Sequence, residues 1–118
     1  MGLFSRRRRT GGPAADEPLS RGARAETLAY LRDFVTTRVG VEAYVEPRTN
    51  VTPTTLMLVA TDGEWTRRKV PDDREAGALA RELGIPVYDV QRTGYPQRVR
   101  DWNTRQGIER KRRAADRA

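Results

Sequence analysis

The sequence predicts a small α+β domain with the element order α-β-β-β-α-β-α over residues 20–106. Three observations predict it: apolar residues at helical spacing near both ends, apolar runs of strand length between them, and an Asp-Gly turn joining two of those runs. We expect a mainly antiparallel three-stranded sheet, a fourth strand added after a helix, and a C-terminal helix docked on the domain. A chain of 118 residues has room for one core of this kind.

The first helix is expected from Ser20, a suitable N-cap, to about Val39, with Gly40 ending it. Its apolar stripe has the spacing i, i+3, i+7 and i+11 and consists of Leu28, Leu31, Val35 and Val39. The alternating segment Val41–Glu46 then predicts a half-exposed strand, which Pro47 ends.

The second strand, Thr55–Thr61, is apolar on both faces, so we expect a central strand covered on both sides. Asp62-Gly63 predicts a two-residue type I′ hairpin turn into a third strand, Glu64–Val70. That turn would set a register in which the strand partners are Thr61 and Glu64, Ala60 and Trp65, and Val59 and Thr66.

Pro71-Asp72-Asp73 predicts the capped start of the next helix, which Gly84 ends. Its buried face is expected to be Ala76, Leu79, Ala80 and Leu83. Ile85–Val90 predicts a short strand, and Pro86 indicates an edge strand or the start of a strand.

The final helix is expected from Pro96 to about Gln106. Val99 and Trp102 share one face and should dock the helix on the domain, which is the commoner role of a tryptophan at this spacing, with base stacking as the alternative. On another face we expect Asp101 to pair with Arg98 and Arg105.

Composition excludes several chemistries. The chain has no cysteine and no histidine, so it has no disulfide, no zinc-thiolate site and no usual general base near neutral pH. No apolar run reaches the length of a membrane span and no secretory leader is visible, so we expect a cytoplasmic protein without integral membrane association.

The net charge of +7 lies at the two ends of the chain. Residues 1–24 hold six Arg and two acids, and residues 98–118 hold eight Arg or Lys and three acids, whereas residues 25–97 hold nine cations and eleven acids. We expect a disordered basic N-terminal tail over residues 1–19 and a solvated basic C-terminal tail over residues 107–118. Basic tails give sequence-independent affinity for phosphates, so RNA, DNA or a ribonucleoprotein is the expected partner.

The candidate nucleic-acid contacts lie on the third strand, the final helix and the C-terminal tail: Arg67, Lys69, Arg98, Arg105, Arg110, Lys111, Arg112 and Arg113. On the third strand, alternation places Arg67 and Lys69 on the face of Trp65. The alternative there is cross-strand pairing with Glu42 and Glu46.

No catalytic, metal or cofactor residue is assigned. Asp62 and Glu64 flank the hairpin glycine, but the turn itself accounts for Asp62. The order α-β-β-β-α-β resembles the restriction-endonuclease-like core, which carries an acid at the start of the second strand and an acid-x-Lys on the third. Here Thr55 and Arg67 stand at those acidic positions, so the resemblance implies a degenerate nuclease at most.

The run "VEAYVEPRTNVTPTTLMLVATDGEWTRRKVP", with "IPVYDV" and "GYPQRVRDW", resembles a family of small uncharacterised proteins of high-GC Gram-positive bacteria. Members carry loose labels such as oxidoreductase, and the resemblance implies no established activity. No glycine-rich dinucleotide fingerprint stands between a strand and a helix, so no cofactor is expected. Non-catalytic nucleic-acid binding is the leading hypothesis, and a protein-interaction module, a degenerate nuclease and a cofactor-dependent oxidoreductase are the alternatives.

Overall fold

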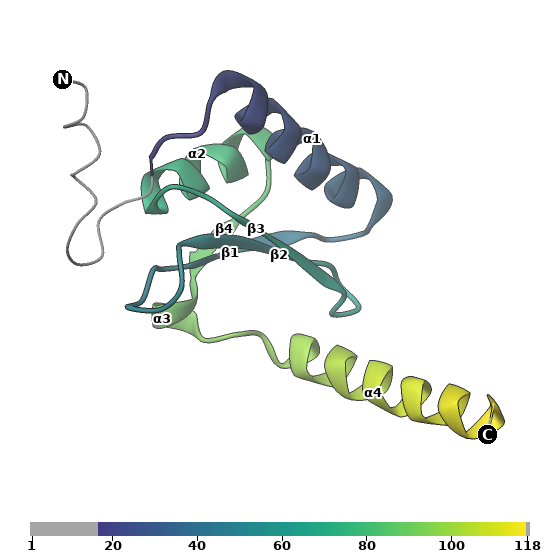
Figure 1. The fold of residues 1–118 in the computed structure, drawn as a ribbon. Helices are drawn as coiled ribbons and strands as arrows, with labels where there is room; N and C mark the ends of the chain where they lie inside the picture. The colour runs from purple at the N-terminus through teal and green to yellow at the C-terminus, as the bar shows by residue number, and fades with distance from the viewer. Residues whose placement is uncertain (1–16, 118) are drawn as a thin grey trace, which may run out of the picture.

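The computed structural model describes residues 17–117 and shows an α+β fold (Figure 1). Most of the predicted N-terminal tail lies outside these residues. The elements in chain order are α1 (Arg21–Thr37), β1 (Glu42–Glu46), β2 (Thr55–Val59), β3 (Trp65–Lys69), α2 (Asp73–Leu83), β4 (Val87–Asp89), α3 (Val90–Thr93) and α4 (Gln97–Arg117). The predicted fold class is confirmed, with the short helix α3 added before α4.

The four strands form one sheet in the order β3-β2-β1-β4. β1 pairs with β2 and β2 with β3 in the antiparallel sense, whereas β4 joins the other side of β1 in the parallel sense. β2 is therefore central and fully covered, as its apolar sequence predicts. β4 is an edge strand, as the proline before it predicts.

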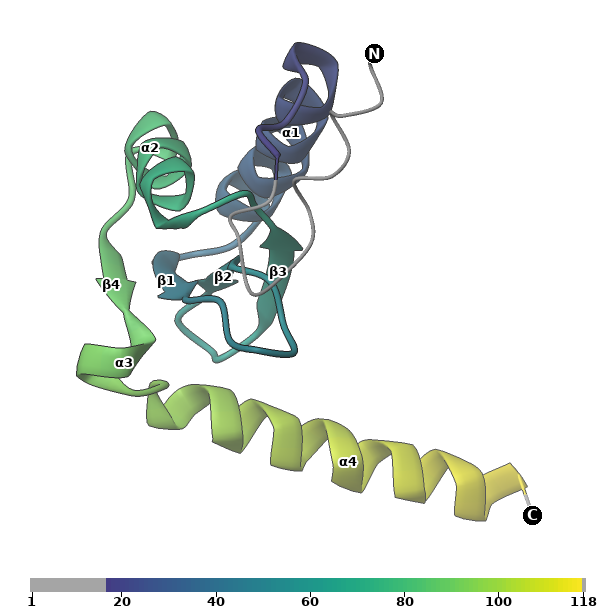
Figure 2. The same ribbon diagram turned by 60° about the vertical axis from the view of Figure 1, so that its left-hand side comes forward.

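Helices cover both faces of the sheet. α1 and α2 lie on one face, and α3 and α4 lie on the other (Figures 1 and 2). The larger core is on the first face, where the four predicted residues of α2 pack with the sheet and with Leu31 and Phe34 of α1. A smaller core of Tyr44, Met57, Val59 and Val99 lies on the second face, which we call the α4 face.

The predicted helix caps of α1 and α2 are confirmed. The Ser20 hydroxyl accepts a hydrogen bond from the amide of Ala23, and the Asp72 carboxylate accepts one from the amide of Glu75. Gly84 ends α2 in the left-handed conformation, with φ at 72°. These local signals fix where each helix begins and ends because each cap satisfies backbone groups that the helix leaves unpaired.

The hairpin differs from the predicted type I′ turn. The amide of Ala60 donates to the carbonyl of Glu64, and the carbonyl of Ala60 accepts from the amide of Gly63, so the loop has three residues. Within this loop only Gly63 has a positive φ, at 96°. The strand partners are Val59 with Trp65 and Leu58 with Thr66, one residue away from the predicted register. Asp62 stays at negative φ because a three-residue loop needs a left-handed residue only at its last position.

The register decides which face each side chain of β3 occupies. Trp65, Arg67 and Lys69 pair with residues of β2 that include Met57 and Val59, so they lie on the α4 face. Strand β1 is not half-exposed as predicted, because its Tyr44 is buried on this face at 6% exposure. Helix α4 covers this face, with Val99 packed against Tyr44.

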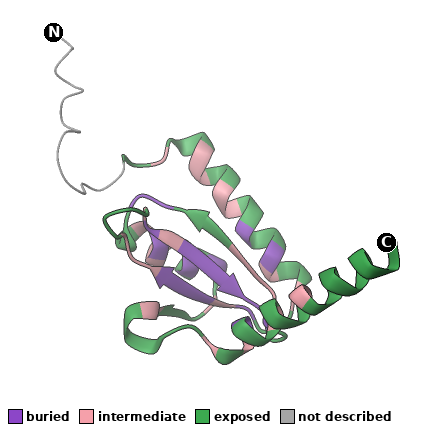
Figure 3. Ribbon diagram, turned by 60° about the horizontal axis from the view of Figure 1, so that its bottom comes forward, coloured by how far each residue is buried: buried purple, intermediate pink, exposed green. Residues whose placement is uncertain are grey.

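Helix α4 is longer than predicted. It begins after Pro96 as expected, but it does not end near Gln106 and continues through Gly107 to Arg117. Its first half crosses the sheet and its second half extends past the hairpin, away from the body (Figure 2). Most of the helix is exposed (Figure 3), and Val99 is its one buried residue. The predicted C-terminal tail is therefore helical within the described residues.

Two separate features require glycine at position 63, where the hairpin contacts α4. Its φ of 96° disfavours any side chain, and a Cβ there would overlap the backbone carbonyl of Arg98. We expect Gly63→Ala to lower the free energy of unfolding by about 2–4 kcal/mol, combining left-handed strain with overpacking. Urea denaturation followed by tryptophan fluorescence measures this loss.

Gly84→Ala is the matched control for this substitution. Gly84 has a similar φ of 72°, but no atom lies within 4 Å of a Cβ built there. It should cost only the conformational part, about 1–2 kcal/mol. Equal losses in the two variants would show that the close approach of α4 to Gly63 contributes nothing.

Candidate functional site

Two glutamates of β1 frame the small core of the α4 face. Glu42 and Glu46 are four residues apart on one strand, so both lie on the same face as Tyr44, which stands between them. A carboxylate at the edge of an apolar core needs hydrogen-bond donors to keep its charge. An arginine reaches each of them from another element.

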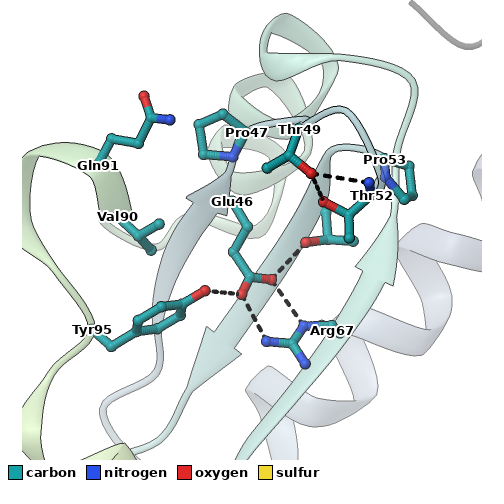
Figure 4. Close-up of a pocket in the computed structure, with 10 residues that line it drawn as sticks. Glu46, Pro47, Thr49, Thr52, Pro53, Arg67, Val90, Gln91 and Tyr95 are labelled. Carbon is teal, nitrogen blue, oxygen red and sulfur yellow. Dashed lines mark hydrogen bonds and ion pairs between the residues drawn. The ribbon is translucent and has the colours of Figure 1, made fainter. Parts of the chain in front are cut away.

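Glu46 receives donors from two strands and from the loop before α4 (Figure 4). Arg67 of β3 donates through Nε at 2.9 Å and Nη2 at 2.7 Å. The hydroxyls of Thr55 and Tyr95 each donate at 2.5 Å. The side chain of Glu46 is only 12% exposed. This cluster, which we call the Glu46 network, ties β1, β2, β3 and the segment before α4 together.

The network shifts three pKa values. Burial raises the pKa of Glu46, but the hydrogen bonds from Arg67, Thr55 and Tyr95 outweigh burial, so the pKa lies below its ordinary value. Burial and the hydrogen bond to Glu46 raise the pKa of Tyr95. The hydrogen bond to Glu46 raises the pKa of Arg67, so this arginine keeps its charge at every ordinary pH.

A pocket of about 500 Å³ opens beside this network (Figure 4). Besides the four members of the network, it is lined by Pro47, Thr49, Thr52, Pro53, Val90 and Gln91. Four donors already occupy the two oxygens of Glu46, which leaves this carboxylate no lone pair for a metal ion. Within residues 17–117 no group of three or more acidic side chains gathers at a metal-binding distance.

The second glutamate, Glu42, is held from α4. Arg98 donates from Nη2 to Glu42 at 2.8 Å and from Nε to the backbone carbonyl of Ala60 at 3.0 Å. Tyr44 also donates to Glu42, at 2.9 Å. The hydrogen bond from Arg98 is the largest cause that lowers the pKa of Glu42, and it outweighs burial.

The predicted pairing of Asp101 with Arg98 and Arg105 is wrong. Asp101 accepts a hydrogen bond from Gln97, one turn earlier on α4. Arg105 donates to the carbonyl of Asp62 in the hairpin turn, 2.8 Å away. Both arginines instead turn toward the sheet and its hairpin, where they bind Glu42 and the backbone carbonyls of Ala60 and Asp62.

Tryptophans complete the contact between α4 and the hairpin. The indole nitrogen of Trp65 donates to Asn103 at 2.9 Å. The guanidinium of Arg105 lies 5.6 Å from the ring centre of Trp102, and that of Arg67 lies 4.7 Å from the ring centre of Trp65. Trp102 is half-buried, which fits the docking role that its helical spacing predicts.

The eight predicted nucleic-acid contacts do not form one patch. Arg67, Arg98 and Arg105 hold the body together through the contacts above, and the pairing of Arg67 with Glu46 follows the alternative that the sequence offered. Lys69 lies at the end of β3 far from the hairpin. Arg110, Lys111, Arg112 and Arg113 lie on the part of α4 that extends beyond the body.

We call residues 107–117 of α4 the basic helix end. Its cations are Arg110, Lys111, Arg112, Arg113 and Arg117, all exposed, and none makes a hydrogen bond or ion pair with any residue that the structure describes. Two acids, Glu109 and Asp116, leave this segment with a net charge of +3. Arg117 was not among the predicted contacts because only the continued helix places it beside Arg113, one turn away.

No family model, curated protein or solved structure matches the chain. The restriction-endonuclease-like resemblance is therefore not confirmed. The residues at its two acidic positions, Thr55 and Arg67, both donate to Glu46. The resemblance to small proteins of high-GC Gram-positive bacteria stays a prediction. Among the described residues no helix is both long and apolar enough to span a membrane.

The Glu46 network makes the free energy of unfolding depend on pH in the acidic range. Because the pKa of folded Glu46 lies below its ordinary value of 4.5, its charge stabilises the fold above that pH and this contribution is lost as the pH falls below it. We expect Glu46→Gln to lower the free energy of unfolding at pH 7 by about 1–3 kcal/mol and to flatten its decline between pH ~5 and ~3. Urea denaturation at a series of pH values measures both effects.

Glu109→Gln is the matched control, since Glu109 is an exposed carboxylate without a partner among residues 17–117. It should leave the free energy of unfolding and its pH profile unchanged. Part of the acid dependence will persist in Glu46→Gln because the pKa of Glu42 is also lowered. An unchanged profile in Glu46→Gln would contradict the role given to this network.

Proposed function

We propose that this protein binds nucleic acid in the cytoplasm, without catalysis, through the basic helix end of α4. One observation carries the proposal: five cations stand exposed and unpaired, within the described chain, on a helix that extends away from the body. When Lys or Arg side chains contact phosphates, the counterions condensed on the nucleic acid are released into solution. This release gives affinity without recognition of the base sequence.

The arrangement of charge in the body supports the same surface. Arg67 and Arg98 each neutralise a glutamate, and Arg105 is bound to a backbone carbonyl, so these cations are less available to phosphates than those of the helix end. Phosphate affinity therefore depends mainly on the C-terminal half of α4. The predicted contribution of the N-terminal arginines concerns residues that lie outside the described ones.

The alternative of a protein-interaction module on the sheet face has less support. Tyr44 is buried beneath Val99, and the ring of Trp65 is covered by Arg67 and hydrogen-bonded to Asn103. Of the two aromatic residues on this face, Tyr44 is therefore buried, and Trp65 is half-buried and already engaged by other side chains.

The test replaces Arg110, Lys111, Arg112 and Arg113 together with glutamine. Fluorescence anisotropy with a labelled 20-base-pair DNA duplex in ~50 mM salt gives the dissociation constant. We expect the affinity to fall at least about tenfold and the slope of log K against log salt to become shallower by roughly 3–4, because each phosphate contact contributes about 0.9.

The matched control is R21Q/R74Q/R81Q/R92Q. It removes the same charge from four exposed arginines of α1, α2 and α3 that have no hydrogen bond or ion pair within residues 17–117. This control should retain most of the affinity, since it acts only through net charge. Equal losses in the two variants would show that total charge, and not the helix end, determines binding.

A further inference from the structure

We infer that the nucleic acid bound by the basic helix end is double-stranded DNA, with this end of α4 lying in the major groove. The inference rests on the proposed function and adds the class of nucleic acid. It depends on three features of α4: where its cations point, how far it extends, and which side chains it lacks.

The cations of the helix end point in several directions, and its two acids, Glu109 and Asp116, share the side between Arg112 and Arg113. Successive residues of an α-helix are about 100° apart, so Arg110, Lys111, Arg112 and Arg113 point in four different directions around the axis. Arg117 returns to the side between Arg110 and Arg113. A helix lying on one extended strand would contact phosphates on one side only. In a groove, the phosphate backbones on both walls can meet cations that point in opposite directions.

The length and width of the basic helix end fit the major groove. Among the described residues, the last hydrogen bond of α4 to the hairpin is made by Arg105, and the basic helix end continues beyond it for eleven residues, from Gly107 to Arg117. They span about 16 Å at 1.5 Å per residue. An α-helix with its side chains is about 10–12 Å across, and the major groove of B-form DNA is about 12 Å wide. The body, placed at one end of α4 in Figures 1 and 2, would stay outside the duplex.

The side chains of the helix end do not favour single strands. Binding of unpaired bases usually relies on exposed aromatic rings for stacking, and residues 107–117 contain none. The nearest ring on α4 is that of Trp102, which is half-buried against the hairpin and has Arg105 beside it. Duplex RNA fits less well because the major groove of an A-form helix is deep and narrow.

The first experiment compares three labelled probes of one sequence by anisotropy in ~50 mM salt: a 20-base-pair DNA duplex, its single strand, and the corresponding RNA duplex. We expect the DNA duplex to bind at least about tenfold more tightly than either of the others. Equal or tighter binding of the single strand or of the RNA duplex would overturn the inference and leave the proposed function standing. No binding of any probe would overturn both.

The second experiment changes the helix and keeps the charge. Ile108→Pro removes a helical hydrogen bond at the start of the basic helix end and should kink or break the helix there. Affinity for the DNA duplex should therefore fall at least about fivefold. Ile108→Ala, the matched control, should bind as the wild type does. Gly107→Ala should bind about twofold more tightly, because alanine strengthens the helix and a Cβ there meets only a distant Arg110 side chain, 3.9 Å away.

Circular dichroism confirms the change in helix content, and urea denaturation confirms that the body of each variant is folded. Should Ile108→Pro destabilise the body, Gly107→Ala still provides the test, because it raises helix content at constant charge. Duplex affinity that follows charge alone, with no difference among these three variants, would show that the segment binds as a flexible tail and would overturn the inference.

Discussion

The pairing of two β1 glutamates with two arginines is the constraint on which the α4 face depends. Glu42 and Glu46 lie at the rim of a small apolar core, where an unpaired carboxylate would be costly. Arg67 supplies one partner from within the sheet, but the partner of Glu42 comes from α4. The ion pair of Glu42 with Arg98 therefore forms only when α4 docks, and it links this helix to the sheet.

This constraint distinguishes two groups of cations on α4 and the sheet. Arg67 and Arg98 neutralise the partly buried Glu46 and Glu42, and Arg105 donates to a backbone carbonyl of the hairpin. The cations from Arg110 onward make no hydrogen bond or ion pair with any described residue. Net charge alone would treat these groups as equal, although the first group is held by contacts within the fold and the second is not.

Local signals made most of the fold predictable from the sequence. The capping residues Ser20, Asp72 and Gly84 and the buried stripe of α2 depend on neighbours within one or two turns, and each was identified correctly. The turn at Asp62-Gly63 was misassigned because an Asp-Gly pair is compatible with both a two-residue and a three-residue loop. The end of α4 was missed because the apolar pattern stops at Gly107, whereas the helix continues with polar residues.

The candidate site was less predictable for a similar reason. Charge alone predicted four cations of the basic helix end as nucleic-acid contacts, and it did not predict Arg117. The sequence did not predict the Glu46 network as a unit, because Tyr95 lies 49 residues after Glu46 along the chain. Only the alternative pairing of Arg67 with an acid of β1 pointed toward it. Contacts that join distant segments leave no periodic signal in a single sequence.

The position of β3 has a consequence for the behaviour of the protein in solution. β3 is an outer strand of the sheet, and an uncovered strand edge is a template for pairing with another chain. Here the edge carries Arg67, Arg68 and Lys69, three consecutive positive charges that would repel the same strand of a second molecule. The opposite edge, β4, is only three residues long and follows a proline. Both borders of the sheet thus resist the addition of further strands and protect the protein against self-association into fibres.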